Sequence, residues 1–181
     1  MKYYKYIDLP NVKAIQARTL EFIQKHGFMD KRGWHYLPLQ QFTYFCPEVN
    51  LALGKYKLWA KETIAIIVSN LNHSKIHIDY VDPMLPECRI NIPILNCAGS
   101  TTEYYSGGEF IKTVRERLPD DPYLNFREDD ASIIKVDEFE LIRPAVIRVK
   151  EPHRVVPNFE AVPRISLSLR CNIDPVFLLE D

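Results

Sequence analysis

Residues Arg89–Tyr105 read RINIPILNCAGSTTEYY, and this stretch shows the character of most of the chain. Its first half is rich in Ile, its last half in Thr and Tyr, and Asn, Gly and Ser lie between them. Short runs of this kind, separated by turn-forming residues, are typical of β-strands joined by tight turns. The stretch therefore predicts two strands, Arg89–Leu95 and Thr101–Tyr105.

The same pattern continues on both sides, from about Glu62 onward. It predicts six further strands: Thr63–Ser69, Ile76–Tyr80, Ser132–Leu141, Ala145–Val149, His153–Val156 and Arg164–Cys171. No helical pattern separates these strands, as parallel βαβ units would require. We therefore expect a mainly β fold, a sandwich or jelly roll. The charged stretch Phe110–Asp130 would form an excursion between strands that could act as a lid.

The first third of the chain has a different character. Asn11–His26 is expected to form a helix, with Asn11 capping its first N–H groups, Gly27 ending it, and Val12, Ile15, Phe22 and Ile23 facing the core. A shorter helix is expected from Cys46 to Gly54, because Pro47 suits the first turn of a helix. The Tyr-rich start, KYYKY, is interpreted as an edge strand. We expect these N-terminal elements to pack outside the β core.

Length and composition restrict the class of protein. A chain of 181 residues fits one domain, with helical support over about 1–60 and a β core over about 62–173. With 23 basic and 24 acidic residues, it has no general attraction to nucleic acid, so a nucleic-acid partner is unlikely. No apolar run is long enough to span a membrane, and no signal peptide is recognisable. The four separated cysteines suggest reduced, mostly buried thiols, so we expect a cytoplasmic protein.

One short motif points to chemistry. In KIHIDYV, His77 and Asp79 are two residues apart, and in an extended strand such residues point to the same side. An imidazole and a carboxylate could therefore reach one metal ion. The motif is weak alone, since chance gives roughly 0.3 H-x-D pairs in a chain of this composition.

A second element, EPHRVVPNFEAVPRISLSLR, follows about 75 residues later. His153 opens one predicted strand, and Arg164 opens the next at a distance suited to a hairpin. His153 would complete a two-histidine, one-carboxylate face on a metal, which leaves open positions on an octahedral Fe(II). Arg164 and Ser166 could face the same interior side and bind a carboxylate.

In this order of H-x-D, distal His and R-x-S, the sequence resembles the Fe(II)- and 2-oxoglutarate-dependent dioxygenases over roughly residues 64–172. The resemblance implies a double-stranded β-helix, which is a jelly roll of cupin-like form, and an oxygenase that uses Fe(II), 2-oxoglutarate and O₂ to hydroxylate a small molecule or a protein side chain. It implies iron ligands at His77, Asp79 and His153. The far carboxylate of 2-oxoglutarate would bind Arg164 and Ser166. No subfamily is indicated.

Other interpretations of these residues stay open. His77 and His153 could be ordinary half-buried strand residues, and Arg164 a cross-strand ion pair. His73 or Asp82 could replace a ligand, although an extended chain would place His73 about 13 Å from His77. Asn91 and Tyr104 could touch the co-substrate or face outward, depending on strand register. The aromatic residues near Trp34 could border a substrate entrance, although a place in the core is the plainer interpretation.

Two rival functions share the expected fold. One is a jelly roll that binds a ligand, such as a sugar or a peptide, without catalysis. The other is a cupin-type metal enzyme that does not use 2-oxoglutarate. Fold alone does not decide between them. The substrate and the oligomeric state are not readable from the sequence.

Overall fold

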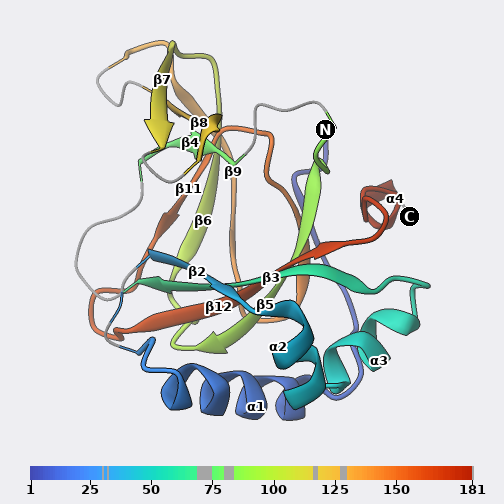
Figure 1. Cartoon of the computed structure of the whole chain (residues 1–181). Helices are drawn as coiled ribbons and strands as arrows, with labels where there is room; N and C mark the ends of the chain where they lie inside the picture. The colour runs from blue at the N-terminus through green and yellow to red at the C-terminus, as the bar shows by residue number, and fades with distance from the viewer. Residues whose placement is uncertain are drawn as a thin grey trace.

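Two antiparallel six-stranded sheets form the centre of the molecule (Figure 1). The computed structural model describes residues 1–29, 31, 33–68, 75–79, 84–115, 118–126 and 130–180. Sheet I has the order β1-β10-β5-β12-β3-β2, and sheet II has the order β7-β8-β4-β11-β6-β9. The strands of sheet I are β1 Tyr4–Tyr6, β10 Ala145–Arg148, β5 Cys88–Leu95, β12 Arg164–Cys171, β3 Ala60–Val68 and β2 Gly33–Leu37. Those of sheet II are β7 Phe110–Arg115, β8 Leu118–Phe126, β4 His77–Ile78, β11 His153–Val156, β6 Thr101–Ser106 and β9 Ile134–Glu140.

The strand connections define a jelly roll. From β3 to β6, successive strands alternate between sheet I and sheet II, and they alternate again from β9 to β12. The first series pairs with the second, so that β3 lies beside β12, β4 beside β11, β5 beside β10 and β6 beside β9. This is the arrangement of a double-stranded β-helix, which confirms the expected mainly β fold.

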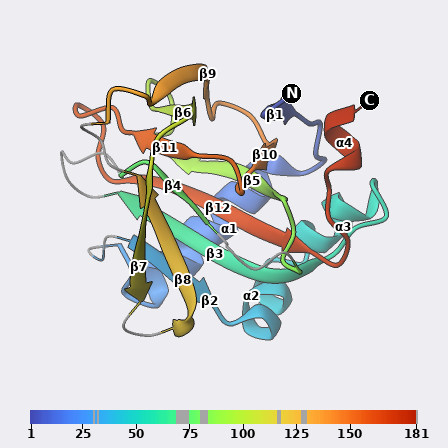
Figure 2. The same ribbon diagram turned by 90° about the horizontal axis from the view of Figure 1, so that it is seen from above.

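In the described residues, four helices accompany the sheets: α1 Val12–Lys25, α2 Leu39–Phe45, α3 Glu48–Gly54 and α4 Phe177–Glu180. The first three cover the outer face of sheet I, and α1 lies behind β12 and β3 when the molecule is seen from above (Figure 2). Ile15, Phe22 and Ile23 of α1 belong to one buried cluster with the outward side chains of β12. The expectation of helices packed outside the β core is therefore confirmed.

Strand alternation divides β12 between two environments. Ile165, Leu167 and Leu169 face the helices and form part of the apolar cluster. Because successive side chains of a strand point to opposite faces, Arg164 and Ser166 face the space between the two sheets. Both are almost fully buried, at 2% and 1% exposure. The interior of the jelly roll therefore contains polar side chains, while the main apolar core lies between sheet I and the helices.

Several local expectations need correction. The side chain of Asn11 makes no capping hydrogen bond, because Asn11 has a left-handed backbone conformation, and α1 begins at Val12. Val12 itself is only half-buried. The second expected helix begins at Glu48, two residues later than expected, and α2 was not expected at all.

Two larger expectations also change. His153 and Arg164 do not lie in a hairpin, because β11 belongs to sheet II and β12 to sheet I. The connection between them crosses from one sheet to the other. The stretch Phe110–Asp130 contains two paired strands, β7 and β8, which extend sheet II beside β4. These two strands were not predicted because the stretch contains proline and paired aspartates, which are rare in strands except at sheet edges.

Other expectations agree with the structure. The Tyr-rich start contains β1, which is the edge strand of sheet I, and β12 has the predicted bounds. Gly27 follows α1 with a positive φ of 67°, the conformation that ends a helix at glycine. All four cysteines are free and buried. No helix in the described parts of the chain is long and apolar enough to cross a membrane.

Candidate metal centre

Neighbouring strands of sheet II bring the two predicted histidine ligands together. β4 pairs with β11 so that His77 and His153 are directly opposite each other. Asp79 follows β4 by one residue, and its N–H donates a hydrogen bond of 2.8 Å to the carbonyl oxygen of Val149. This bond holds the end of β4 against the segment that leads into β11. The fold thus brings residues 77, 79 and 153 to one place, as the sequence motifs predict.

The donor atoms of these three residues have a spacing suited to one ion. Asp79 Oδ1 lies 3.4 Å from His77 Nε2 and 3.7 Å from His153 Nε2. One potential ligand atom from each residue lies within 4.8 Å of the others. When two donor atoms each lie about 2.1 Å from the same metal ion and their bonds to it form a right angle, the two donors are about 3 Å apart. A small inward adjustment would therefore let all three side chains bind one ion.

The backbone orients both imidazole rings. The Nδ1 atom of His77 lies 2.7 Å from the carbonyl oxygen of Lys75, and that of His153 lies 2.8 Å from the carbonyl oxygen of Glu151. A carbonyl only accepts, so each Nδ1 carries a proton and each Nε2 presents its lone pair toward Asp79. Ligand histidines in metalloproteins are oriented in this way by partners at the second nitrogen.

The protonation states also suit a metal. Burial is the main cause that lowers the pKa of His153, to about 4, and the neighbouring His77 lowers it further. Burial alone would raise the pKa of Asp79, but the influence of the neighbouring His77, His153 and Arg89 side chains outweighs it, so this pKa is lowered. At neutral pH the site therefore holds a neutral His153 and an ionised Asp79. These are the forms that bind divalent metals.

Arg164 and Ser166 lie on the opposite sheet, in β12. Arg164 Nη1 is 3.4 Å from Ser166 Oγ, a long hydrogen bond. Burial lowers the pKa of the guanidinium. Its buried Nε atom has no hydrogen-bond partner, and within the described ranges no carboxylate forms an ion pair with it. A buried cation without a counter-charge is costly, so this position favours an anionic ligand.

The remaining candidates fall into three groups. Tyr104 lies in the interior, with its ring centroid 5.9 Å from that of His153, and the amide oxygen of the buried Asn91 has no partner among the residues that the structure describes. His26 lies outside the interior, next to α1, where its ring packs on Phe22. His73 and Asp82 fall outside the described residues.

Two further residues lie beside the site: Trp34, for which a place in the core was the favoured interpretation, and Arg89, which was not singled out from the sequence. The ring of Trp34 lies 6.2 Å from that of His77, so this aromatic residue borders the site. Arg89 is 1% exposed, pairs with Glu62 at 2.6 Å, and contributes to the lowered pKa of Asp79. Alternation in RINIP could have indicated Arg89, since it shares a strand face with Asn91.

The donor set fits a divalent transition metal. Two imidazole nitrogens and one carboxylate on a single face are the ligands of non-haem Fe(II) centres that keep other positions open. The buried arginine across the interior adds a site for an acidic group. The arrangement can therefore hold a metal ion and an organic acid in one water-poor space.

Comparisons with known proteins give a limited result. No protein-family model matches the chain, and no curated protein matches it. Among solved structures, the chain is similar to the non-heme alpha-ketoglutarate-dependent carbocyclase SnoK from nogalamycin biosynthesis, with 13% identity and a TM-score of 0.49 over 94% of this chain and 79% of that one. It is also similar to AviO1 from Streptomyces viridochromogenes Tue57, with 9% identity and a TM-score of 0.46 over 96% and 90% of the two chains. Likeness of this degree carries no functional argument, so a function has to be argued from the side chains.

Proposed function

We propose that this protein is a non-haem oxygenase that depends on Fe(II) and 2-oxoglutarate. His77, Asp79 and His153 would hold the iron, and Arg164 with Ser166 would bind the far carboxylate of 2-oxoglutarate. The observation that carries the proposal is the meeting, in one buried interior, of a three-ligand cluster and an arginine that has no carboxylate partner in the described chain. A substrate of this enzyme would be a small molecule or a protein side chain.

The residues of the chain would orient the metal ligands, bind the co-substrate by charge and exclude bulk water. The backbone carbonyls at positions 75 and 151 keep the Nε2 atoms of both histidines directed inward. The guanidinium of Arg164 would fix the co-substrate by a charge-assisted contact, and Ser166 would add a hydrogen bond. With 2-oxoglutarate, the bound iron would supply activation of O₂, with release of CO₂ and succinate and oxidation of the substrate. Burial of all five side chains keeps bulk water away from this chemistry.

The test is an anaerobic titration of the purified protein with Fe(II) and 2-oxoglutarate. We expect a weak visible charge-transfer band that His153→Ala abolishes and His26→Ala keeps, because His26 is exposed and remote from the site. On admission of O₂, the protein should form succinate from 2-oxoglutarate, even without its substrate. Absence of the band and of succinate in the intact protein would contradict the proposal.

The same assay separates the rival functions. A jelly roll that only binds a ligand would form no succinate. A metal enzyme that does not use 2-oxoglutarate would retain its activity in Arg164→Ala. The proposal instead requires that Arg164→Ala weaken 2-oxoglutarate binding strongly while metal binding at the three ligands persists.

A further inference from the structure

The interior between the two sheets is divided into a polar half and an aromatic half. The polar half contains the candidate metal ligands, on β4, β11 and the residue after β4, and Arg164 on β12. The other half lies beneath β1, β6, β9 and β10. Its buried members are Tyr104, Phe139, Leu141, Ala145, Ile147 and Val149, with Tyr3, Tyr4, Tyr6 and Leu85 packed against them.

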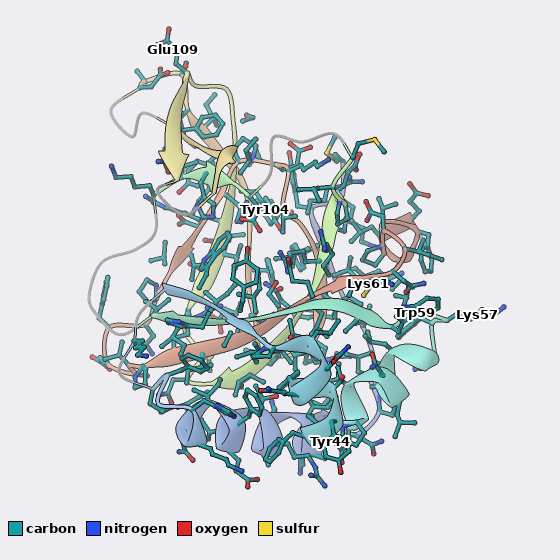
Figure 3. The ribbon with its side chains drawn as sticks, in the orientation of Figure 1. Tyr44, Lys57, Trp59, Lys61, Tyr104 and Glu109 are labelled. Carbon is teal, nitrogen blue, oxygen red and sulfur yellow. The ribbon has the colours of Figure 1, made fainter. Side chains whose placement is uncertain are left out.

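Tyr104 stands at the boundary between these halves. It is directly opposite His153 in the pairing of β6 with β11, so both side chains point into the interior. Figure 3 shows Tyr104 between the sheets, whereas the labelled Tyr44 and Lys57 project outward. The Tyr104 ring is completely buried and lies 5.9 Å from the His153 ring, centroid to centroid. It therefore packs against a candidate metal ligand.

The N-terminal segment holds the other side of Tyr104. The Tyr3 ring stacks on the Tyr104 ring, with centroids 4.8 Å apart and an angle of 26° between the planes. The backbone fixes Tyr3, because the N–H of Arg148 donates to the Tyr3 carbonyl at 2.9 Å and Arg148 Nε donates to that of Lys2 at 3.0 Å. Three rings thus form a continuous row from the N-terminal segment to His153.

We infer that Tyr104 is a positioning residue for His153, and that Tyr3 holds Tyr104 in place. The hydrogen bond from His153 Nδ1 to Glu151 fixes one edge of the imidazole, but the plane of the ring can still turn about that bond. A packed aromatic neighbour limits this rotation, and side chains that support metal ligands affect metal affinity by their orientation. The first residues of the chain would then be part of the metal site, although they are far from its ligands in sequence.

The aromatic ring of Tyr104, and not its hydroxyl, would hold His153 in position. Among the described residues, the buried Tyr104 OH has no hydrogen-bond partner, because the neighbouring N–H of Arg148 donates to the Tyr3 carbonyl. Removing such a hydroxyl leaves the packing unchanged. Tyr104→Phe should therefore keep both the orientation of His153 and the metal affinity, whereas Tyr104→Leu should lose them.

The test compares two tyrosines of the same segment. Tyr3→Ala removes a ring that stacks directly on Tyr104. Tyr4→Ala removes a ring that stacks on Phe139, 4.1 Å away, and Phe139 lies 6.4 Å from Tyr104, so Tyr4 is one ring further from Tyr104. In metal-free protein with labelled histidine, we expect Tyr3→Ala to shift the ring signals of His153 and Tyr4→Ala to leave them in place. Tyr3→Phe should restore the wild-type signals. Affinity for Co(II) should fall on the order of tenfold in Tyr3→Ala only.

The Co(II) measurement rests on the proposed function, but the measurement of the histidine signals does not, so the two can fail separately. Equal shifts of the His153 signals in Tyr3→Ala and Tyr4→Ala, or no shift in either, would overturn the inference. If Tyr3→Ala does not fold, Tyr3→Leu keeps apolar volume without the ring and gives the same comparison. Failure of the wild-type protein to bind Co(II) would contradict the metal site alone, because the histidine signals are measured without metal.

Discussion

The surroundings of Arg164 are costly for the ligand-free protein and favourable for binding an anion. It is 2% exposed, and its hydrogen bond is to the neutral hydroxyl of Ser166. A structural arginine in this position would need a carboxylate, because an uncompensated buried charge destabilises the fold. No carboxylate among the described residues offsets this cost, and a bound anion would offset it.

This predicts opposite effects of Arg164→Met on stability and binding. Methionine fills similar space without a charge, so the free energy of unfolding of the ligand-free protein should stay the same or rise by about 1 kcal/mol. Affinity for 2-oxoglutarate should fall on the order of 100-fold, since a hydrogen-bonded charge contact is lost. Chemical denaturation and anaerobic titration measure the two effects, with Arg18→Met, an exposed arginine of α1, as the control. A loss of several kcal/mol of stability with unchanged 2-oxoglutarate binding would show that Arg164 is structural.

His153 predicts a dependence of stability on pH. Its pKa is about 4 in the folded protein, against an ordinary value of 6.5. Between these values the unfolded chain binds a proton that the folded protein does not, so the stability contributed above pH 6.5 is lost as the pH falls toward 4. The shift corresponds to about 3 kcal/mol.

Urea denaturation of the metal-free protein between pH 6.5 and 4 measures this effect. His153→Asn should show a flatter dependence than the wild-type protein, because it lacks the titrating ring. The carboxylates titrate in both proteins and largely cancel in the difference. Parallel profiles for the two proteins would mean that folding does not lower the pKa of His153, and would contradict this prediction.

The sequence predicted that His77, Asp79 and His153 lie together and that Arg164 and Ser166 face the same side, but not how the strands bring them there. The H-x-D spacing and strand alternation are local properties, and they were sufficient for His77 and Asp79. The position of Arg164 was inferred from a hairpin that does not exist. Arg164 reaches the interior because β12 belongs to sheet I while β11 belongs to sheet II, and no local spacing encodes how two sheets pack. Arg89 was not singled out, although its alternation with Asn91 in RINIP could have indicated it.

Among the elements, β12 contributes one face to the apolar core and the other face to the candidate site. Leu167 faces the helices and is completely buried, and Ser166 faces the interior beside Arg164. These adjacent residues therefore offer a matched pair of substitutions.

Leu167→Ala should lower the free energy of unfolding by about 3 kcal/mol, because it leaves a cavity in the apolar core, and should leave 2-oxoglutarate affinity unchanged. Ser166→Ala should change stability by less than about 1 kcal/mol and lower 2-oxoglutarate affinity about fivefold. Denaturation and binding titrations of both variants check the pair. An affinity loss in Leu167→Ala equal to that in Ser166→Ala would show that the two faces are not independent.

Elements with a clear residue pattern were predicted well, and those set by tertiary packing were not. β12 alternates between buried faces over its whole length, so its bounds were readable. α2 contains Thr, Tyr and Phe, which have weak helix propensity, and it forms because Phe42 packs into the core beneath sheet I. β7 and β8 contain residues unsuited to a central strand, and they pair at the edge of sheet II. In both cases contacts made elsewhere in the chain outweigh the local preference.

At the scale of the whole molecule, the candidate site joins residues from positions 77 to 166 and both sheets. A ligand that binds them only in the folded state must stabilise the entire fold. At a concentration about 100 times its Kd, a ligand adds about 2.7 kcal/mol, which raises the Tm of a protein of this size by about 5 to 10 °C.

We therefore expect Mn(II) to raise the Tm of the wild-type protein, and 2-oxoglutarate to raise it further only when Mn(II) is present. His77→Ala should abolish both increases, and Arg164→Met only the second. Calorimetry or a thermal-shift assay measures these values. An increase with 2-oxoglutarate that does not depend on the metal would contradict the proposed arrangement.

The most direct test is a crystal structure of the protein soaked in Mn(II), with anomalous diffraction data collected near the manganese absorption edge. We predict one strong anomalous peak about 2.0 to 2.2 Å from His77 Nε2, His153 Nε2 and a carboxylate oxygen of Asp79. A well-ordered crystal in which the soaked ion binds elsewhere, with the two imidazoles turned away from each other, would contradict the shared metal site.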